Sequence, residues 1–246
     1  MAITVGRITI DGSAAPSGVS SWNSSQYETA VNGLLSQLNG RAAGRAVVAA
    51  IVQPMRIVPW PNPSECNATG GPTDWVAGTP AGRSVRQCGG PATGAPWQPS
   101  GAPVIGTGAG SPAQVSFTPG MWGPSGSCAG TASGPGSQPV EILLHEMVHG
   151  MRATAGFLHC EAMGLHYDTE EEFVAVTVTN MYMSEGGAMQ LRASHLGFAP
   201  LMNLSTFYGG VAEHSRMIRR LFVQQPQFAR ALSRVRCRFN PFLEHV

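Results

Sequence analysis

The stretch that most constrains the fold is residues 143–149, which reads Leu-Leu-His-Glu-Met-Val-His and contains an H-E-x-x-H motif. Residues four positions apart lie on the same face of an α-helix, so His145 and His149 would project from one side. Two imidazoles at this spacing can hold one tetrahedral metal ion, most often Zn²⁺. Glu146 points to one side of them, where it can hold a metal-bound water rather than the metal itself.

The residues around the motif favour a helix that is buried on one side. Ser137 is a suitable cap, Pro139 suits the first turn and Gly156 is a suitable C-terminal stop. The apolar residues on the arc roughly opposite the two histidines are Leu143, Leu144, Met147, Val148 and Met151. This pattern predicts a helix with a zinc site on one face. The alternative is an ordinary core helix with two hydrogen-bonded histidines.

The composition limits the partners of the chain. Apolar residues make up 43% of the 246 residues, enough for a sizeable core, whereas charged residues make up 12% and the formal net charge is +1. A nucleic acid or an anionic membrane as main partner would favour a basic excess. No apolar run is long enough to span a bilayer. We therefore expect one domain over residues 1–246, with no nucleic-acid partner and no membrane span. The sequence does not indicate an oligomeric state.

The cysteines do not form a recognisable metal cluster, because none of them has C-x-x-C spacing. They form either one or two disulfides, which would indicate an oxidising compartment, or remain thiols. The sequence does not give their connectivity. The five cysteines are Cys66, Cys88, Cys128, Cys160 and Cys237.

The front of the chain, residues 1–136, is expected to be rich in β-strand. Residues 45–52 form a continuous apolar run whose length and β-branching favour a buried strand. The other elements expected here are a strand or hairpin over residues 3–10 that is closed at Asp11-Gly12, a helix over about 25–38 with Ser24 as cap and Gly40 as stop, and a strand over 55–59 that extends or pairs with the apolar run.

A long segment dense in Gly, Pro and Ser, residues 61–136, follows these elements. Loops of this length in compact domains are uncommon and often functional. Residues 114–118 alternate in polarity and predict a strand, the last before the motif helix. Such a strand could pair with an extended substrate by edge addition.

The back of the chain, residues 137–246, is expected to be helical. Residues 170–183 predict a helix that is capped by Thr169, begins with acidic residues and ends at Gly186-Gly187. Two further helices are predicted over about 211–224 and 227–235. The fold class is therefore α+β, with a β-rich first part that contains one helix, then the motif helix, then a helical C-terminal part.

A catalytic zinc site needs a third protein ligand and an open position. The long metzincin form of the motif would require Gly and His where Arg152 and Ala155 stand, so that class is excluded. The remaining class takes a Glu from a following helix. Glu172 shares a mostly apolar stripe with residues such as Val176, where a carboxylate is costly unless a metal compensates it.

Other residues remain open as the third ligand. Glu171 is the second choice, and the further alternatives are His159, His166 and Asp168. Glu170 lies toward the polar side of the predicted helix and fits a charge at its first turn.

The chain resembles the zincin metallopeptidases of the Glu-ligand branch, the gluzincins, and within them bacterial toxin and effector proteases such as the catalytic domain of anthrax lethal factor. The residues that carry the resemblance are His145-Glu146-Met147-Val148-His149, followed by Glu172-Phe173-Val174-Ala175. The resemblance covers about 45 residues and implies a zincin-like fold with one Zn²⁺ per chain. It implies His145, His149 and Glu172 as ligands and Glu146 as general base.

The expected activity is therefore hydrolysis of a peptide bond in a protein or peptide by a zinc-bound water. The oxyanion needs a further donor. Tyr167 is the first candidate, because related toxin proteases place a Tyr slightly upstream of the ligand Glu. Tyr208 and His214 are the others.

The resemblance also implies a toxin or effector domain that is secreted or delivered into a target cell and has an immunity or inhibitor partner. Residues 1–7 lack the basic start and apolar core of a signal peptide, so we expect a chain that is cytosolic, cut from a longer protein, or exported by a route that reads no such signal. Disulfides would point to a periplasmic site of action. Three functions remain as alternatives to a zinc peptidase. They are a zinc hydrolase of a non-protein amide such as a cell-wall peptide, a non-catalytic binding module stabilised by zinc, and a metal-free recognition domain.

Overall fold

The computed structural model describes residues 2–14, 22–73, 85–91, 99–104, 109–159, 163, 167–208 and 212–243, without the side chains of 85–91, 99–104, 206 and 208. The described residues form an α+β fold, as predicted, with a mixed β-sheet, two helices between its second and third strands, and further helices after it in the chain.

The main sheet has five strands in the order β1-β2-β3-β7-β4. The strands are β1 (Ile3–Val5), β2 (Ile8–Ile10), β3 (Met55–Val58), β7 (Ala113–Ser116) and β4 (Thr69–Pro72). β2, β3 and β7 run parallel to one another, while β1 and β4 pair antiparallel at the two ends of the sheet. A second sheet has the order β6-β5-β8, with β5 at Val85–Pro91, β6 at Pro99–Val104 and β8 at Leu158–His159.

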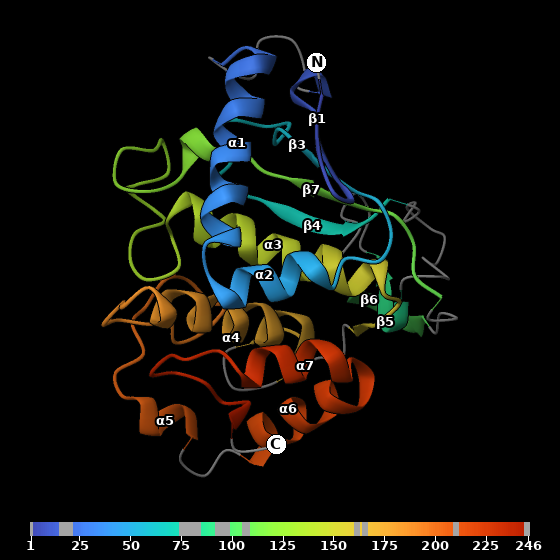
Figure 1. Cartoon of the computed structure of the whole chain (residues 1–246), viewed down its shortest axis with the longest axis vertical. Helices are drawn as coiled ribbons and strands as arrows, with labels where there is room; N and C mark the ends of the chain where they lie inside the picture. Colours follow the sequence, from blue (N-terminus) through green and yellow to red (C-terminus); the bar gives the residue numbers. More distant parts are fainter. Residues whose placement is uncertain are drawn as a thin grey trace.

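Helices cover the sheet and continue below it in Figure 1. α1 (Ser24–Asn39) stands beside the strands, and α2 (Ala42–Ala49) lies across the lower end of α1. α3 (Pro139–Thr154) packs on β4 and β7 on one side and on α4 (Glu170–Glu185) on the other. The remaining helices are α5 (Leu204–Tyr208), α6 (Ala212–Gln224) and α7 (Pro226–Ser233), with short 3₁₀ helices at Gly12–Ala14 and Pro119–Met121.

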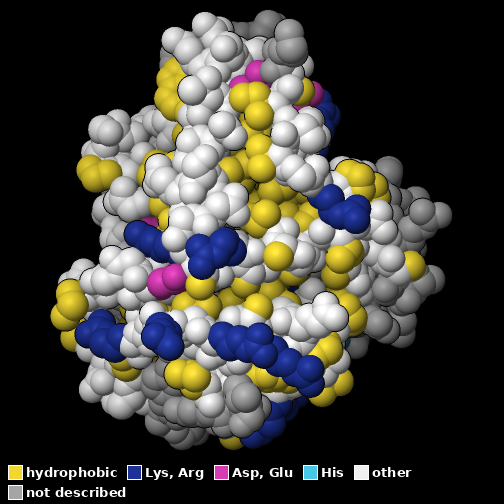
Figure 2. Space-filling view, in the orientation of Figure 1, with side chains coloured by type: hydrophobic (Ala, Val, Ile, Leu, Met, Phe, Trp, Pro, Cys, Tyr) yellow, Lys and Arg dark blue, Asp and Glu magenta, His cyan; other side chains and the backbone are white. Residues whose placement is uncertain are grey.

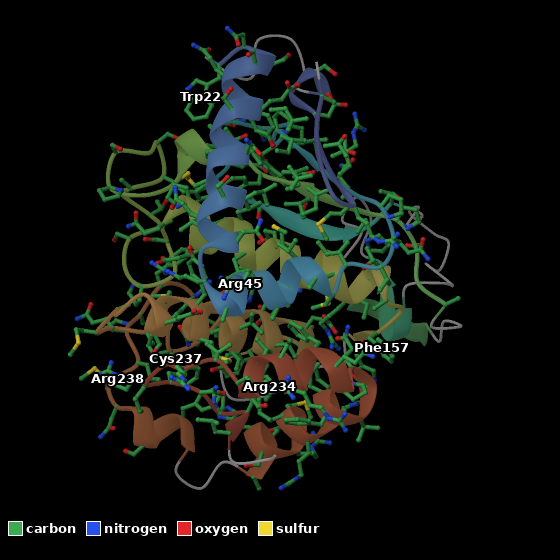
Figure 3. The ribbon with its side chains drawn as sticks, viewed as in Figure 1. Trp22, Arg45, Phe157, Arg234, Cys237 and Arg238 are labelled. Carbon is green, nitrogen blue, oxygen red and sulfur yellow. A yellow bond between two sulfur atoms is a disulfide. The ribbon has the colours of Figure 1, made fainter. Side chains whose placement is uncertain are left out.

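The motif helix α3 therefore lies in the middle of the core. Trp22, beside the start of α1, and Phe157, beyond the end of α3, are labelled at opposite sides of the view in Figure 3.

None of the helices in the described ranges is both long and apolar enough to cross a bilayer.

The prediction of a buried strand over residues 45–52 was wrong, because most of this run belongs to helix α2. Ala43, Ala46 and Val47 are buried at helical spacing. The Glu185 carboxylate of α4 accepts hydrogen bonds from the amides of Ala42 and Ala43, which caps the helix from a distant element. A short apolar run does not distinguish a strand from a buried helix.

The predicted strand over 114–118 exists as β7, but it is not an edge strand. β7 lies between β3 and β4, so both of its edges are paired. The expectation that this strand binds substrate by edge addition was therefore wrong, and among the described residues β4 takes the outer position beside it.

Two predicted helix caps were shifted by one residue. The side chain of Asn23, not Ser24, accepts the Gln26 amide at the start of α1. Gln138, not Ser137, precedes α3 and forms a reciprocal cap with Glu141. Thr169 caps α4 as predicted.

Candidate metal centre

Helix α3 holds the motif rigidly because its apolar face is fully packed. Leu143, Leu144, Met147 and Val148 are each 0% exposed. The backbone leaves the helix through Gly156, whose φ of 74° is readily adopted by glycine. The two histidines of the motif are also buried, so their orientation is fixed by packing.

Helix α4 brings Glu172 to the two histidines. The Nε2 atoms of His145 and His149 lie 3.2 Å apart. Glu172 Oε2 lies 3.0 Å from His145 Nε2 and 3.4 Å from His149 Nε2. Ligand atoms that are each about 2.0–2.1 Å from a tetrahedral zinc are about 3.3–3.4 Å apart. The three donor atoms therefore stand at the corners of a triangle that a zinc ion fits.

The charges at this triangle also suit a cation. Burial lowers the pKa of His145 to about 3, so its imidazole is neutral and able to donate a lone pair. Burial would also lower the pKa of His149, but the Glu172 carboxylate outweighs burial and raises that pKa to about 9. Burial raises the pKa of Glu172, yet the two histidines outweigh it and hold the pKa well below its usual range. The carboxylate of Glu172 thus favours a positive charge at this triangle.

Glu146 lies at the wall of a cavity next to the triangle. Burial raises the pKa of its carboxyl to about 7, and the Gly70 amide of β4 donates a hydrogen bond that opposes this shift. The backbone of β4 runs very close to α3, because a Cβ on Gly70 would lie 2.0 Å from the Glu146 carbonyl oxygen. A carboxyl with a pKa near 7 can both accept and return a proton at neutral pH.

The cavity has a volume of about 280 Å³. Its walls come from the segment before β4, the loop after β7, helix α3 and the segment after α4. The lining residues are Cys66, Asn67, Ala68, Trp122, Thr131, Ala132, Ile142, His145, Glu146, Arg192, His195 and Phe198. A disulfide between Cys66 and Cys128 joins the first two of these wall segments. Cys237 is a half-buried free thiol, and Cys88 and Cys160 lie outside the described side chains.

His195 is a residue of the site that the sequence reasoning missed. Its Nε2 lies 3.3 Å from Glu172 Oε2 and its ring stacks on that of His145, with the ring centres 5.9 Å apart. Its Nδ1 pairs with the Asp168 carboxylate at 2.7 Å. His145, Glu172 and His195 also form a group of donor atoms within 4.8 Å of one another. His195 stands in an irregular segment with no motif spacing, so nothing in the sequence pointed to it.

The neighbouring glutamates, Glu171 and Glu170, have other partners. Glu171 pairs with Arg152 at 2.7 Å and accepts the His159 amide. Glu170 pairs with Arg220 and with His159 Nδ1. The expectation that Glu170 lies on a polar side was wrong, because α4 is buried nearly all round and Glu170 is 4% exposed.

The remaining candidates lie elsewhere or are engaged. Asp168 pairs with His195 rather than with the triangle. The Tyr167 hydroxyl donates to the Ala193 carbonyl, and Tyr167 is absent from the cavity lining given above. Burial raises its pKa to about 12, so the hydroxyl stays protonated. His214 packs between Phe207 and Phe173. His166 and the side chain of Tyr208 lie outside the described residues.

Comparison of the sequence with models of known protein families and with curated proteins found no match.

Proposed function

We propose that this chain is a zinc-dependent metallopeptidase of the zincin type. The observation that carries the proposal is the convergence of His145, His149 and Glu172, whose donor atoms are 3.0–3.4 Å apart. Of these three residues His145 lines the cavity, and Glu146 and His195 line it as well. These three residues would hold one Zn²⁺, and three protein ligands are the number found in catalytic zinc sites.

The roles of the residues follow from their positions. When bound, zinc would supply the Lewis acidity that polarises a carbonyl and activates water. Glu146 would take the proton from the attacking water and deliver it to the leaving nitrogen. His195, held by Asp168, is a better-placed donor to the developing oxyanion than Tyr167.

A peptide is the substrate that the cavity walls favour. β4 is the outer strand of the main sheet in the part of the chain that is described, and the residues just before it, Asn67 and Ala68, line the cavity. An extended peptide could add to this edge and pass in front of Glu146. A cell-wall peptide would use the same contacts, so protein and peptidoglycan substrates must both be assayed.

A second candidate is a structural zinc site without catalysis. It is favoured by the 3.3 Å distance from His195 Nε2 to Glu172, which would let His195 close the fourth position. A closed four-ligand site stabilises a fold but leaves no place for water.

The first experiment measures zinc content by elemental analysis in the wild type and two variants. We expect about one zinc per chain in the wild type and a marked loss in Glu172→Ala. The surface variant Glu213→Ala, which changes a carboxylate paired with Arg216, should keep its zinc. Equal zinc in Glu172→Ala and Glu213→Ala would remove Glu172 from the ligand set.

The second experiment separates catalysis from structure. Glu146→Gln should keep its zinc and lose cleavage of a protein library by at least about 10²- to 10⁴-fold. Retention of full cleavage in Glu146→Gln would overturn the proposed mechanism. Absence of any cleavage by the zinc-loaded wild type, on protein and peptidoglycan alike, would favour the structural site.

We also propose that the domain acts as a toxin or effector in an oxidising compartment, with an immunity or inhibitor protein as partner. The Cys66–Cys128 disulfide at the cavity wall supports this, because disulfides persist in such compartments. Expression in a bacterial periplasm should slow growth more than expression in the cytosol. Equal growth in both, matching the Glu146→Ala control, would contradict the proposal.

A further inference from the structure

Arg192 is the arginine among the residues that line the cavity. Other arginines gather on the face shown in Figure 2, where Arg45, Arg234 and Arg238 are labelled in the same view in Figure 3. Arg192 differs from these because it is 7% exposed and shares the cavity with Glu146 and His195. Its charge therefore acts inside the candidate active site.

Arg192 sits at the base of a hairpin-like loop. The loop is closed by hydrogen bonds from the Leu201 amide to the Leu191 carbonyl and from the Ala193 amide to the Ala199 carbonyl. The Asn180 side chain fixes the Arg192 backbone from α4, since it accepts from the Arg192 amide and donates to the Arg192 carbonyl, both at 2.8 Å. This arrangement places the side chain relative to the helix that carries Glu172.

The guanidinium is held in one orientation. Its Nε donates to the Gly197 carbonyl and its Nη2 donates to the His195 carbonyl, each at 2.8 Å. Its Cζ lies 4.4 Å from the centre of the Phe198 ring. The Nη1 group makes no hydrogen bond to any described residue. A fixed guanidinium with a spare donor group loses little entropy when it binds a ligand.

Among the described residues, no carboxylate forms an ion pair with Arg192. The described oxygens that its guanidinium contacts are neutral carbonyls. The similarly buried Arg152 pairs directly with Glu171. Glu172 and Glu146 act on Arg192 electrostatically, but Glu172 is directed at the histidines. Buried charges are normally paired, so this one is available to an anion.

We propose that Arg192 binds a carboxylate of the substrate and makes the enzyme selective for peptides with an acidic group close to the scissile bond. This inference rests on the proposed peptidase function and names its substrate class. Arg recognises a carboxylate through charge-assisted hydrogen bonds. The apolar residues Ile142, Ala132 and Phe198 also line the cavity. The carboxylate comes either from an Asp or Glu side chain or from a free C-terminus.

The test uses three fluorescent peptide pools that are otherwise identical. The first contains Asp and Glu and has blocked ends, the second contains Asn and Gln in their place with blocked ends, and the third is the second with a free C-terminal carboxylate. Binding is measured by fluorescence anisotropy on the zinc-loaded Glu146→Gln variant, and cleavage is measured on the wild type. The same measurements are made with Arg192→Gln, with Arg192→Lys, and with the exposed control Arg216→Gln.

We expect an acidic pool, either the first or the third, to bind roughly 10- to 100-fold more tightly than the second, the range for a hydrogen-bonded charge. Which pool is preferred identifies the source of the carboxylate. Arg192→Gln should reduce the preference to less than about twofold, Arg192→Lys should retain part of it, and Arg216→Gln should retain all of it.

Equal binding of the three pools would overturn the role of Arg192, and so would a preference that survives in a folded Arg192→Gln variant. If Arg192→Gln does not fold, two comparisons still test the role of Arg192. They are the comparison of the three pools in the proteins that keep Arg192, and the same comparison in Arg192→Lys. Because binding is measured without turnover, a preference in binding without cleavage would refute the peptidase while retaining the anion site.

Discussion

Three consecutive glutamates at the start of α4 have three different partners. Glu170 meets Arg220, Glu171 meets Arg152 and Glu172 meets the motif histidines. Successive residues of a helix point about 100° apart, so one run of like charges can serve three separate contacts. Glu171 and Glu170 connect α4 to α3 and α6 through their ion pairs, whereas Glu172 is directed at the motif histidines.

At the residue scale, His195 distinguishes a catalytic site from a closed one. We expect His195→Ala to keep about one zinc per chain and to lower kcat/KM by roughly 10²- to 10³-fold, the usual loss for one oxyanion donor. Elemental analysis and peptide cleavage are measured on the same preparation. Asp168→Asn, which retains a side chain that can hydrogen-bond His195, should lose less. Loss of zinc in His195→Ala would instead make His195 a fourth ligand.

At the scale of elements, the close approach of β4 to α3 shapes the site. Gly70 allows the strand to lie directly against the Glu146 backbone, where no side chain would fit. The same contact brings the Gly70 amide to the Glu146 carboxyl. The position of Glu146, the proposed general base, therefore depends on a glycine in a neighbouring strand.

Gly70→Ala is expected to destabilise the fold by about 1–3 kcal/mol, as overpacking does, and to reduce cleavage because β4 must move away from Glu146. Gly33→Ala is the matched control, since a Cβ there would meet nothing within 4 Å on the exposed side of α1. That change should stabilise the protein by about 0.5–1 kcal/mol. Urea unfolding of both variants checks this prediction, and similar effects of the two changes would contradict it.

The end of β2 carries a pH-dependent contact. Hydrogen bonds from Ser13 and from Arg56 lower the pKa of Asp11 below its ordinary value of 3.8. Because the folded pKa is depressed, this contact contributes stability above about pH 4 and loses it as the pH falls through the folded pKa. Asp11→Asn should therefore be less stable than the wild type at pH 7, with a difference that shrinks in acid. Thermal unfolding from pH 7 to pH 2 measures it, and a constant difference would contradict it.

At the scale of the whole molecule, the site joins the two parts of the chain. The β-rich part supplies β4 and the cavity wall around Cys66 and Cys128, and the helical part supplies all the proposed ligands. Figure 1 shows α3 crossing the middle of the molecule between the sheet and the lower helices. A substrate in the cavity would therefore touch both parts.

Reduction of the Cys66–Cys128 disulfide should lower stability by up to about 4 kcal/mol, the entropic value for a closed loop of this length. Chelation of zinc should lower the melting temperature separately, because a ligand that binds only the folded state stabilises it. Thermal unfolding with reductant, with chelator and with both measures the two effects. A Cys128→Ser variant that melts like the wild type in the absence of reductant would contradict the predicted stabilisation by the disulfide.

The sequence by itself determined the features that depend on local periodicity. It gave the α+β class, helix α4 from Glu170 and its Thr169 cap, and the spacing that places His145 and His149 on one face of α3. It also singled out Glu172, although for an incorrect reason, because α4 has no distinct polar side. These predictions needed only residues within a few turns of one another.

Only the tertiary structure decided the features that depend on remote contacts. α2 is a helix partly because Glu185 caps it, β7 is an interior strand because β4 pairs beside it, and His195 and Arg192 reach the cavity on an irregular loop. No spacing rule links such residues to the motif. Their positions are set by packing and hydrogen bonds between distant segments, which the order of residues along one element does not encode.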